Sequence, residues 1–378
     1  METDERKYRI LLLGDFSNLH SQLGKTLTEM GHDVTVISDG CGFQQTARTH
    51  DISRKPGKLN GALLAAKFAW PLHKHLKGYD IVAVTGPYFA GLREQRLRWV
   101  FERLRGENER IFTTFCSTDP VYINECLGND SLLRYNEYRI GDKPSPLALS
   151  PQARLNEWLT PTMVDYTDFF YDNLDGAVSV LYEYDLVARH RLGDDKVEYA
   201  GIPIDVNAIE PYSMNFNDGK VRLFLGRHAH RIVEKGTDIL EKAARAVCGR
   251  NPGKAELVIV ENRPYDEYVK LMRDSHIILD QLYSYTPATN AMIAMAHQLV
   301  TVSGGEPEYY DFIGERTNKP IINADPEDFD GLVARLDSFV RDPQSLIDYG
   351  ARGRQFVESH NEARLVAQRF LDAWTKRL

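Results

Sequence analysis

The stretch that most constrains the fold runs from Ser275 to Glu308, SHIILDQLYSYTPATNAMIAMAHQLVTVSGGEPE. HIILDQ and LVTVS are short apolar runs, which is the pattern of strands buried on both faces of a parallel sheet. Between them, Thr286 is a candidate N-cap and Pro287 a candidate first helical residue, so we expect a helix that ends near His297. Strand, helix and strand in this order predict a β-α-β unit.

The same stretch has features of a ligand site. Gly304 and Gly305 let the backbone turn tightly at the carboxyl end of the second strand, the edge where open α/β sheets bind ligands. The N–H groups at the start of the helix after Pro287 would suit a diphosphate. The alternative is an ordinary β-α-β unit without a ligand, and these residues alone do not decide between the two.

Length and composition narrow the class of protein. The chain has 378 residues, which is too long for one compact core and predicts two domains. Its 43% hydrophobic and 26% charged residues are typical of a globular enzyme. We expect a cytoplasmic protein without a metal site, because there is no apolar run of membrane-spanning length and no signal-peptide core. The four scattered cysteines also lack metal-ligand spacing.

Charge is unevenly distributed along the chain. The formal net charge is −8, but residues 1–110 carry 17 Lys+Arg against 13 Asp+Glu. The cluster REQRLRWVFERLR (93–105) has the spacing of an amphipathic helix. Its apolar positions are Leu97, Val100, Phe101 and Leu104. Its basic face suits an anionic acceptor or peripheral membrane contact, although such faces are more often simply solvated. An acidic chain without an aromatic and basic stripe predicts no nucleic-acid partner.

Strands and helices alternate in both halves of the chain. This alternation predicts an α/β fold with two doubly wound, Rossmann-like parallel-sheet domains facing each other. The polar stretch 204–218 separates an N-terminal domain, 1–203, from a C-terminal one that begins at 219. Residues 116–172 are less regular and contain several prolines, so we expect an insertion that shapes a cleft. The expected strands are 8–14, 33–38, 81–86, 110–115, 176–181, 197–201, 221–226, 255–260, 276–281 and 299–303.

Several motifs then follow one another in a specific order. They are TFCSTDP (114–120), GRHAHRIVEKG (226–236) and AMAHQLVTVSGGEPE (294–308), followed by the tail from 323 to 357. In this order and spacing the chain resembles the retaining GT-B glycosyltransferases of the family 4 group. The resemblance implies a GT-B fold, with a C-terminal domain that extends to 357 and a last helix (358–378) that packs back on the N-terminal domain.

The resemblance also implies an activity. It is the transfer of a sugar, with retention, from a nucleotide sugar to a glycan or glycolipid acceptor, as in polysaccharide biosynthesis. No metal or cofactor takes part, and the nucleotide sugar is a co-substrate. The cations that would stabilise the leaving diphosphate are Lys235 and either Arg231, which we favour, or Arg227.

The other candidate site residues come from the cleft edges of both domains. Asp280 ends a buried strand, where an acidic residue normally faces a ligand or caps a helix. The remaining donor-binding candidates are Gln281, Tyr283, Tyr285, Thr286, Thr289, Asn290, Gly304, Gly305 and Glu308. The acceptor-side candidates, from GDFSNLHSQLG (14–24) and TFCSTDP, are Asp15, Ser17, Asn18, His20, Cys116 and Asp119. Asp119 is also a candidate helix cap.

Three positions depart from the family pattern. Tyr285 and Ile293 stand where the family has two glutamates eight residues apart, and Cys116 stands at its donor-sugar histidine. Isoleucine cannot accept a hydrogen bond from a ribose hydroxyl, which costs about 1–3 kcal/mol. One hypothesis is an active enzyme with a rebuilt donor site; the other is a noncatalytic carbohydrate-binding or assembly subunit. A sugar-nucleotide epimerase of the same fold is a third, disfavoured by the loss of glutamate and histidine.

Overall fold

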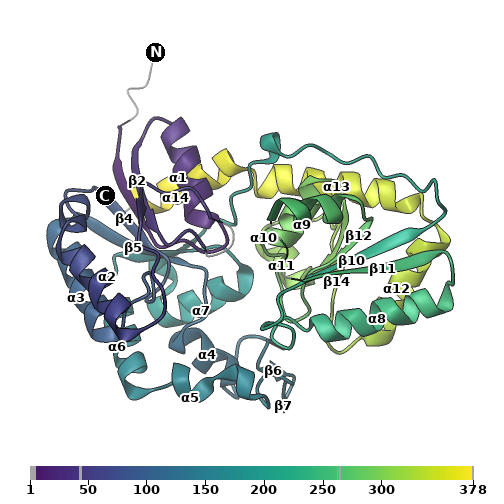
Figure 1. Ribbon diagram of the computed structural model, residues 1–378, viewed down its shortest axis with the longest axis horizontal. Coiled ribbons are helices and arrows are strands. Elements are labelled where there is room, and N and C mark those ends of the chain that lie inside the picture. Colours follow the sequence, from purple (N-terminus) through teal and green to yellow (C-terminus); the bar gives the residue numbers. More distant parts are fainter. Residues whose placement is uncertain (1–5, 42–44, 262, 264, 377–378) are drawn as a thin grey trace.

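The computed structural model describes residues 6–41, 45–261, 263 and 265–376, and contains two parallel sheets that lie side by side (Figure 1). The first has the strand order β3-β2-β1-β4-β5-β8-β9 and the second β11-β10-β12-β13-β14. The strands of the first are β1 (Arg9–Leu13), β2 (Asp33–Ser38), β3 (His50–Asp51), β4 (Ile81–Val84), β5 (Arg110–Phe115), β8 (Gly176–Ser179) and β9 (Val197–Tyr199). Those of the second are β10 (Val221–Arg227), β11 (Ala255–Glu261), β12 (Ile277–Leu279), β13 (Val300–Ser303) and β14 (Ile322–Asn323). The predicted α/β class is confirmed.

Strand β1, in the interior of the first sheet, shows why its residues form a buried strand. Ile10 to Leu13 have no exposed surface, and β1 pairs in parallel with β2 and β4. Side chains alternate between the two faces of a strand, so Ile10 and Leu12 enter one core and Leu11 and Leu13 the other. Because both faces of β1 are buried, its sequence has to be apolar at every one of these positions.

Helices cover both faces of each sheet. In the first domain, α1 (Leu19–Glu29) and α14 (Ala363–Thr375) share one core, while α2 (Lys58–Ala69), α3 (Glu94–Glu107) and α6 (Pro161–Asp172) share the other. In the second, α8 (Thr237–Arg250) and α12 (Phe329–Arg341) cover one face; α9 (Tyr265–Arg273) and α10 (Thr289–Ala296) cover the other. The remaining helices are α4 (Pro120–Leu127), α5 (Leu155–Trp158), α7 (Tyr182–Leu192), α11 (Pro307–Phe312) and α13 (Ser345–His360).

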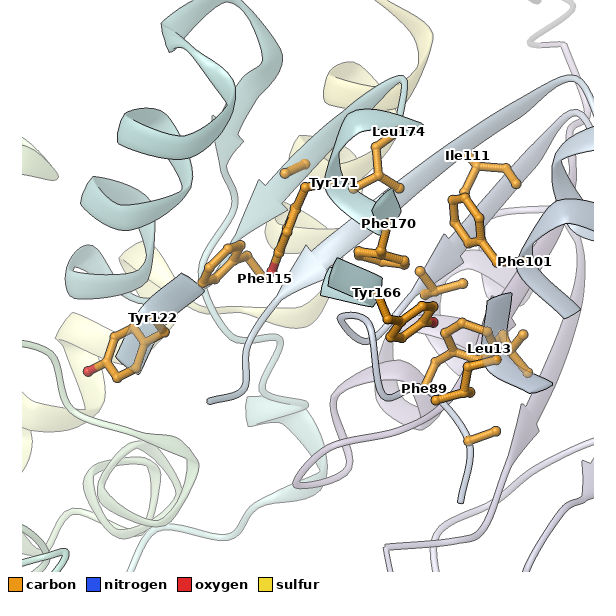
Figure 2. Close-up of a cluster of buried hydrophobic side chains, with 14 of the residues drawn as sticks. Leu13, Phe89, Phe101, Ile111, Phe115, Tyr122, Tyr166, Phe170, Tyr171 and Leu174 are labelled. Carbon is orange, nitrogen blue, oxygen red and sulfur yellow. The ribbon is translucent and has the colours of Figure 1, made fainter. Parts of the chain in front are cut away.

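The segment expected to be an irregular insertion, 116–172, contains three helices. Pro120 and Pro161 stand at the first turns of α4 and α6, where proline begins a helix and does not break it. Figure 2 shows Phe170 and Tyr171 of α6 inside the hydrophobic core. The short antiparallel hairpin of β6 (Arg139–Ile140) and β7 (Lys143–Pro144) lies between α4 and α5.

The predicted β-α-β unit is present, but its helix begins later than expected. α10 starts at Thr289, and its N-cap position is Ala288, without a side-chain cap. The expectation that Thr286 caps a helix starting at Pro287 is wrong. The Thr286 hydroxyl donates to Glu183 and accepts from the Tyr182 N–H, so this residue contacts the N-terminal domain.

The chain passes between the domains twice, and the two passages touch. Ile204 N donates to Asn361 O at 2.8 Å, and Ala363 N donates to Ile204 O at 2.9 Å. Beyond this point α14 packs on α1, and Trp374 lies in the N-terminal core near Phe112. The described part of the chain holds no helix with the length and apolarity that a bilayer crossing requires.

Candidate functional site

Polar side chains converge where three strands of the second sheet end. Asp280, which is 2% exposed, accepts hydrogen bonds from Asn290 Nδ2 at 3.1 Å and Ser303 Oγ at 3.0 Å. Lys235 Nζ lies 4.0 Å from Asp280 Oδ1. The structure therefore brings together predicted residues from three separate segments. Ser303 was missed, because a serine at the end of a strand is not distinctive in a sequence.

Two glycines allow this convergence. A Cβ on Gly236, whose φ is +63°, would lie 2.6 Å from Leu282 Cβ, so only glycine lets the loop with Lys235 meet the loop after β12. A Cβ on Gly304 would lie 2.2 Å from the carbonyl oxygen of Ser284. The loops after β10, β12 and β13 thus approach at distances that leave no room for side chains at these points.

The two candidate arginines have different environments. Arg227 forms ion pairs with Glu241 of α8 and with Glu261 at the end of β11, on the side of β10 away from Asp280. Arg231 lies on the loop before α8, pairs with Glu234, and keeps 44% of its side chain exposed. This arrangement favours Arg231 as the mobile cation and gives Arg227 a structural role.

A contact across the cleft joins the predicted residues Tyr285 and Glu308 to Arg134 and Tyr135, which the sequence did not indicate. Arg134, from the segment between α4 and β6, donates to Glu306 Oε2 at 2.7 Å and to Glu308 Oε1 at 2.8 Å. Tyr135 stacks on Tyr285 with ring centroids 4.8 Å apart and donates to Glu306 Oε1 at 2.6 Å. The Tyr285 phenol oxygen accepts from the Arg134 backbone N–H at 2.7 Å. We call this set of five residues the cross-cleft contact.

Next to it, a buried carboxylate joins the domains. Glu183, at the start of α7, accepts from Ser284 Oγ and Thr286 Oγ1, both at 2.8 Å. Burial raises the pKa of Glu183. Tyr285 and Thr286, predicted to bind a donor, are therefore engaged between the domains in this structure. The prediction of a donor role for them requires that the domains separate.

His20 does not face the cleft, contrary to its proposed acceptor role. It has no exposed surface, and its ring nitrogens lie 2.9 Å from Gly14 O and 2.8 Å from Thr114 Oγ1. Burial lowers the pKa of His20 to about 4, so the ring is neutral. His20 joins the loop after β1 to β5, as a buried histidine with two hydrogen-bond partners.

The rest of that loop has an unusual backbone. Ser17 and Asn18 adopt positive φ angles of 52° and 68°. Asp15 stabilises this conformation by accepting from His20 N at 2.9 Å and Thr46 Oγ1 at 2.8 Å. Asn18 is exposed and Ser17 half-buried, so both are accessible to an acceptor. Strained backbone of this kind is concentrated at functional sites.

Cys116 and Asp119 also lie inside the N-terminal domain. Cys116 is 3% exposed, and burial raises the pKa of its thiol. Asp119 accepts from Tyr122 N at 2.9 Å and from the Tyr171 hydroxyl, which makes it the cap of α4. Burial raises the pKa of Asp119 to about 6. The capping alternative for Asp119 is thus observed, and neither side chain reaches the cleft surface.

The remaining candidates lie around the same strand ends. Gln281 and Thr289 are half-buried, while Tyr283 is buried against Gly236. Gly305 N donates to Asn323 Oδ1 at 2.9 Å. Ile293 lines a cavity of about 490 Å³ between the linker, α9 and α10, so its apolar side chain faces a partly apolar space.

No known family model matches the chain, and no curated protein matches its sequence. Solved structures do match over nearly the whole chain. Sucrose-phosphate synthase from Thermosynechococcus elongatus aligns at 13% identity and TM-score 0.60, covering 98% of this chain and 99% of its own. Anabaena HepE in complex with UDP-glucose aligns at 12% identity and TM-score 0.59, covering 98% and 100%.

An α-glucosyltransferase in complex with UDP and DNA aligns equally well, at 12% identity and TM-score 0.59, covering 98% and 100%. Likeness at this level of identity shows the fold, which is the two-domain GT-B fold.

Proposed function

We propose that the chain is a retaining, metal-independent glycosyltransferase that moves a sugar from a nucleotide sugar to a glycan or glycolipid acceptor. The observation that carries this proposal is the placement of Lys235 beside the buried Asp280, at the strand ends that face the cleft. An ammonium held by a buried carboxylate has a fixed position, and a fixed cation stabilises charge that develops on a departing diphosphate.

In the proposed reaction, Asp280, Lys235 and Arg231 have separate roles. Asp280 orients Lys235 and the Asn290 amide, which in turn lies at the start of α10. Arg231 exchanges its exposed pair with Glu234 for a phosphoryl oxygen, because a guanidinium makes two parallel hydrogen bonds to such oxygens. Closure of the cleft then excludes water and brings an acceptor hydroxyl to the anomeric carbon.

The donor and acceptor classes have different support. Neighbouring structures of the same fold contain UDP or UDP-glucose, which favours a nucleotide sugar as the donor. The glycan or glycolipid acceptor follows from the sequence resemblance. One neighbour was solved with DNA, so an oligonucleotide belongs in the acceptor panel, against our expectation of no nucleic-acid partner.

A noncatalytic carbohydrate-binding subunit is the second candidate. It is favoured by the Tyr285 phenol, which binds the backbone of Arg134 where the family places a glutamate. Ile293 supports it too, because an apolar side chain faces the cavity at the second glutamate position. In this case the cleft would bind a glycan without a nucleotide.

A thermal-shift screen with UDP, GDP, ADP, CMP and their sugar conjugates separates these candidates. A ligand present at about 100 times its Kd stabilises the folded state by about 2.7 kcal/mol. We expect one nucleotide to raise the Tm of the protein, and the Lys235→Ala variant to lose that shift. No shift with any nucleotide, together with a shift on adding oligosaccharides, would establish the noncatalytic subunit.

A further inference from the structure

Helix α2 is apolar on its outer face as well as its inner one. Leu64 and Phe68 are buried in the core of the N-terminal domain, and Gly61 is buried beside Arg54 and Arg96. On the opposite side, Leu59 is 73% exposed and Leu63 is 59% exposed. A helix that is apolar all round is normally covered on every side. The outer face of α2 therefore lacks its partner within the described part of the chain.

The exposed residues form one stripe. Leu59, Leu63, Ala66 and Trp70 follow the spacing i, i+4, i+7 and i+11, which places them on a single face. Trp70, directly after the helix, is 81% exposed. Figure 1 shows α2 at the outer side of the N-terminal domain, away from the second sheet. We call Leu59, Leu63, Ala66 and Trp70 the α2 stripe.

The chain segment that carries the stripe has only positively charged side chains. No Asp or Glu occurs between Asp51 and Asp80, a span that contains six Lys and Arg residues. These are Arg54, Lys55, Lys58, Lys67, Lys74 and Lys77. None of the five lysines forms an ion pair with a carboxylate of the described residues, and Lys55, Lys58, Lys74 and Lys77 are exposed.

We propose that the α2 stripe and its lysines bind the surface of an anionic lipid bilayer. Leucine and tryptophan side chains on a short helix lie in the headgroup region, while lysines around them attract anionic lipids. A protein partner would need acidic groups to match six cations as well as an apolar groove, and a bilayer supplies both features at once. The proposal goes beyond the transferase activity and does not depend on it.

The segment that leads into α2 is joined to a neighbouring loop of the N-terminal domain. α2 follows β3 at the carboxyl edge of the first sheet, and the Arg54 guanidinium donates to the carbonyl oxygen of Gly91, in the segment after β4. Arg96 of the basic helix α3 lies beside Gly61, on the buried face of α2 and not on the stripe.

Vesicle binding tests the proposal. We would measure co-sedimentation of the full chain with phosphatidylcholine vesicles, with and without phosphatidylglycerol, and follow tryptophan emission. We expect binding only with phosphatidylglycerol, a blue shift that is absent in Trp70→Ser, and weaker binding as salt increases. Leu63→Ser with Trp70→Ser should reduce the partition coefficient at least about tenfold. Lys55→Glu with Lys58→Glu should do the same.

Ile347→Ser is the matched control, because Ile347 is 47% exposed on α13 of the other domain, and it should bind vesicles like the wild type. All substitutions are at exposed positions, so unchanged circular dichroism and Tm serve as the folding check. The proposal is overturned if the wild type does not bind anionic vesicles, or if the stripe variants bind as well as Ile347→Ser. A different outcome would also overturn it: the wild type forms a concentration-dependent dimer, and the stripe variants lose this dimer but still bind vesicles. The stripe would then bind a second copy of the chain and not a bilayer.

Discussion

At the scale of single residues, the donor side depends on one buried carboxylate. Asp280 has two neutral hydrogen-bond donors and one ammonium nearby, so its charge is stabilised before any ligand arrives. The Asp280 carboxylate can hold the Lys235 ammonium in place and still leave this cation able to interact with a ligand. The acceptor side contrasts with this, because His20, Cys116 and Asp119 have their polar groups turned into the core.

The two arginines near the donor site give a matched pair of variants. Arg231→Ala and Lys235→Ala should each weaken nucleotide-sugar turnover by about 3 kcal/mol, roughly a hundredfold in kcat/KM. Arg227→Ala should leave turnover unchanged and lower the Tm, because its partners Glu241 and Glu261 would lose their common cation. Steady-state kinetics together with thermal melts distinguish these results. Equal kinetics for all three variants would remove the diphosphate assignment.

Asp280→Asn tests the carboxylate itself. If Asp280 orients Lys235, this variant should lose turnover while its Tm falls little, because asparagine keeps one oxygen that accepts from Asn290 and its amide N–H can donate to the Ser303 hydroxyl, which also accepts. Activity and denaturant titration measured on the same preparation provide the comparison. A loss of stability that accounts for the whole loss of activity would mark Asp280 as structural.

His20 gives a prediction about pH. Its folded-state pKa of about 4 lies below the unfolded value of about 6.5, so the unfolded state binds more protons between these values. Its contribution to stability is therefore complete above pH 6.5 and is lost as pH falls toward 4, by about 3 kcal/mol. In His20→Gln this loss should disappear, so the stability gap between wild type and variant should narrow on acidification. Urea unfolding across this pH range measures the gap, and a constant gap would contradict the assignment.

At the scale of elements, short loops set the geometry of the site. The loops after β10, β12 and β13 meet at Gly236 and Gly304, where added side-chain atoms would collide with Leu282 or the Ser284 carbonyl. These loops follow parallel strands, whose carboxyl ends lie on one edge of the sheet. The distances between the loops are consequently as important for the site as the side chains that they carry.

Gly304→Ala should therefore destabilise the protein by about 1–3 kcal/mol and reduce nucleotide binding, because the Cβ forces two site loops apart. Gly249→Ala in α8 is the control, since its Cβ meets no atom within 4 Å and alanine favours a helix. Denaturant unfolding of both variants checks the prediction. A Gly304→Ala protein as stable as the control would show that the loops can move apart freely.

The elements also show which patterns in the sequence were reliable. The strands at 33–38 and 110–115 have the predicted bounds, because both are six-residue segments rich in β-branched or aromatic side chains, which favour strands. The apolar positions predicted for the basic helix α3 are also buried in the structure. The predicted start of α10 was wrong, because the Thr286 hydroxyl donates to the Glu183 carboxylate of the other domain and does not cap the helix. Within 116–172, the start of α4 was anticipated by Asp119 as a candidate cap, whereas α6 was missed because Pro161 at its first turn was taken as a break.

At the scale of the whole molecule, two sets of contacts hold the domains together across the cleft. Arg134 reaches Glu306 and Glu308, and Glu183 reaches Ser284 and Thr286. The hinge side is formed separately, where Ile204 and Ala363 pair. Access of a nucleotide sugar to Tyr285 therefore requires that the cross-cleft contact breaks while the hinge stays intact.

Arg134→Ala should shift the molecule toward an open cleft. Its ion pairs with Glu306 and Glu308 are the charged part of the cross-cleft contact, so we expect a larger radius of gyration in small-angle X-ray scattering. Arg316→Ala is the control, because Arg316 pairs with Asp311 at the surface of the same region without crossing the cleft. Identical scattering of the two variants would show that Arg134 does not hold the domains together.

The sequence by itself determined the architecture. Apolar runs of strand length alternate with helical periods, and such runs can bury their side chains only between two layers of helices. It also indicated Asp280 and Asn290, which lie next to the ends of elements at one sheet edge, and Lys235, through the resemblance of its motif to the glycosyltransferase family. The tertiary structure alone decided how these residues meet and which candidates turn inward. Contacts such as Arg134 with Glu306, 172 residues apart, depend on how two domains pack, and no local pattern in a chain encodes that distance.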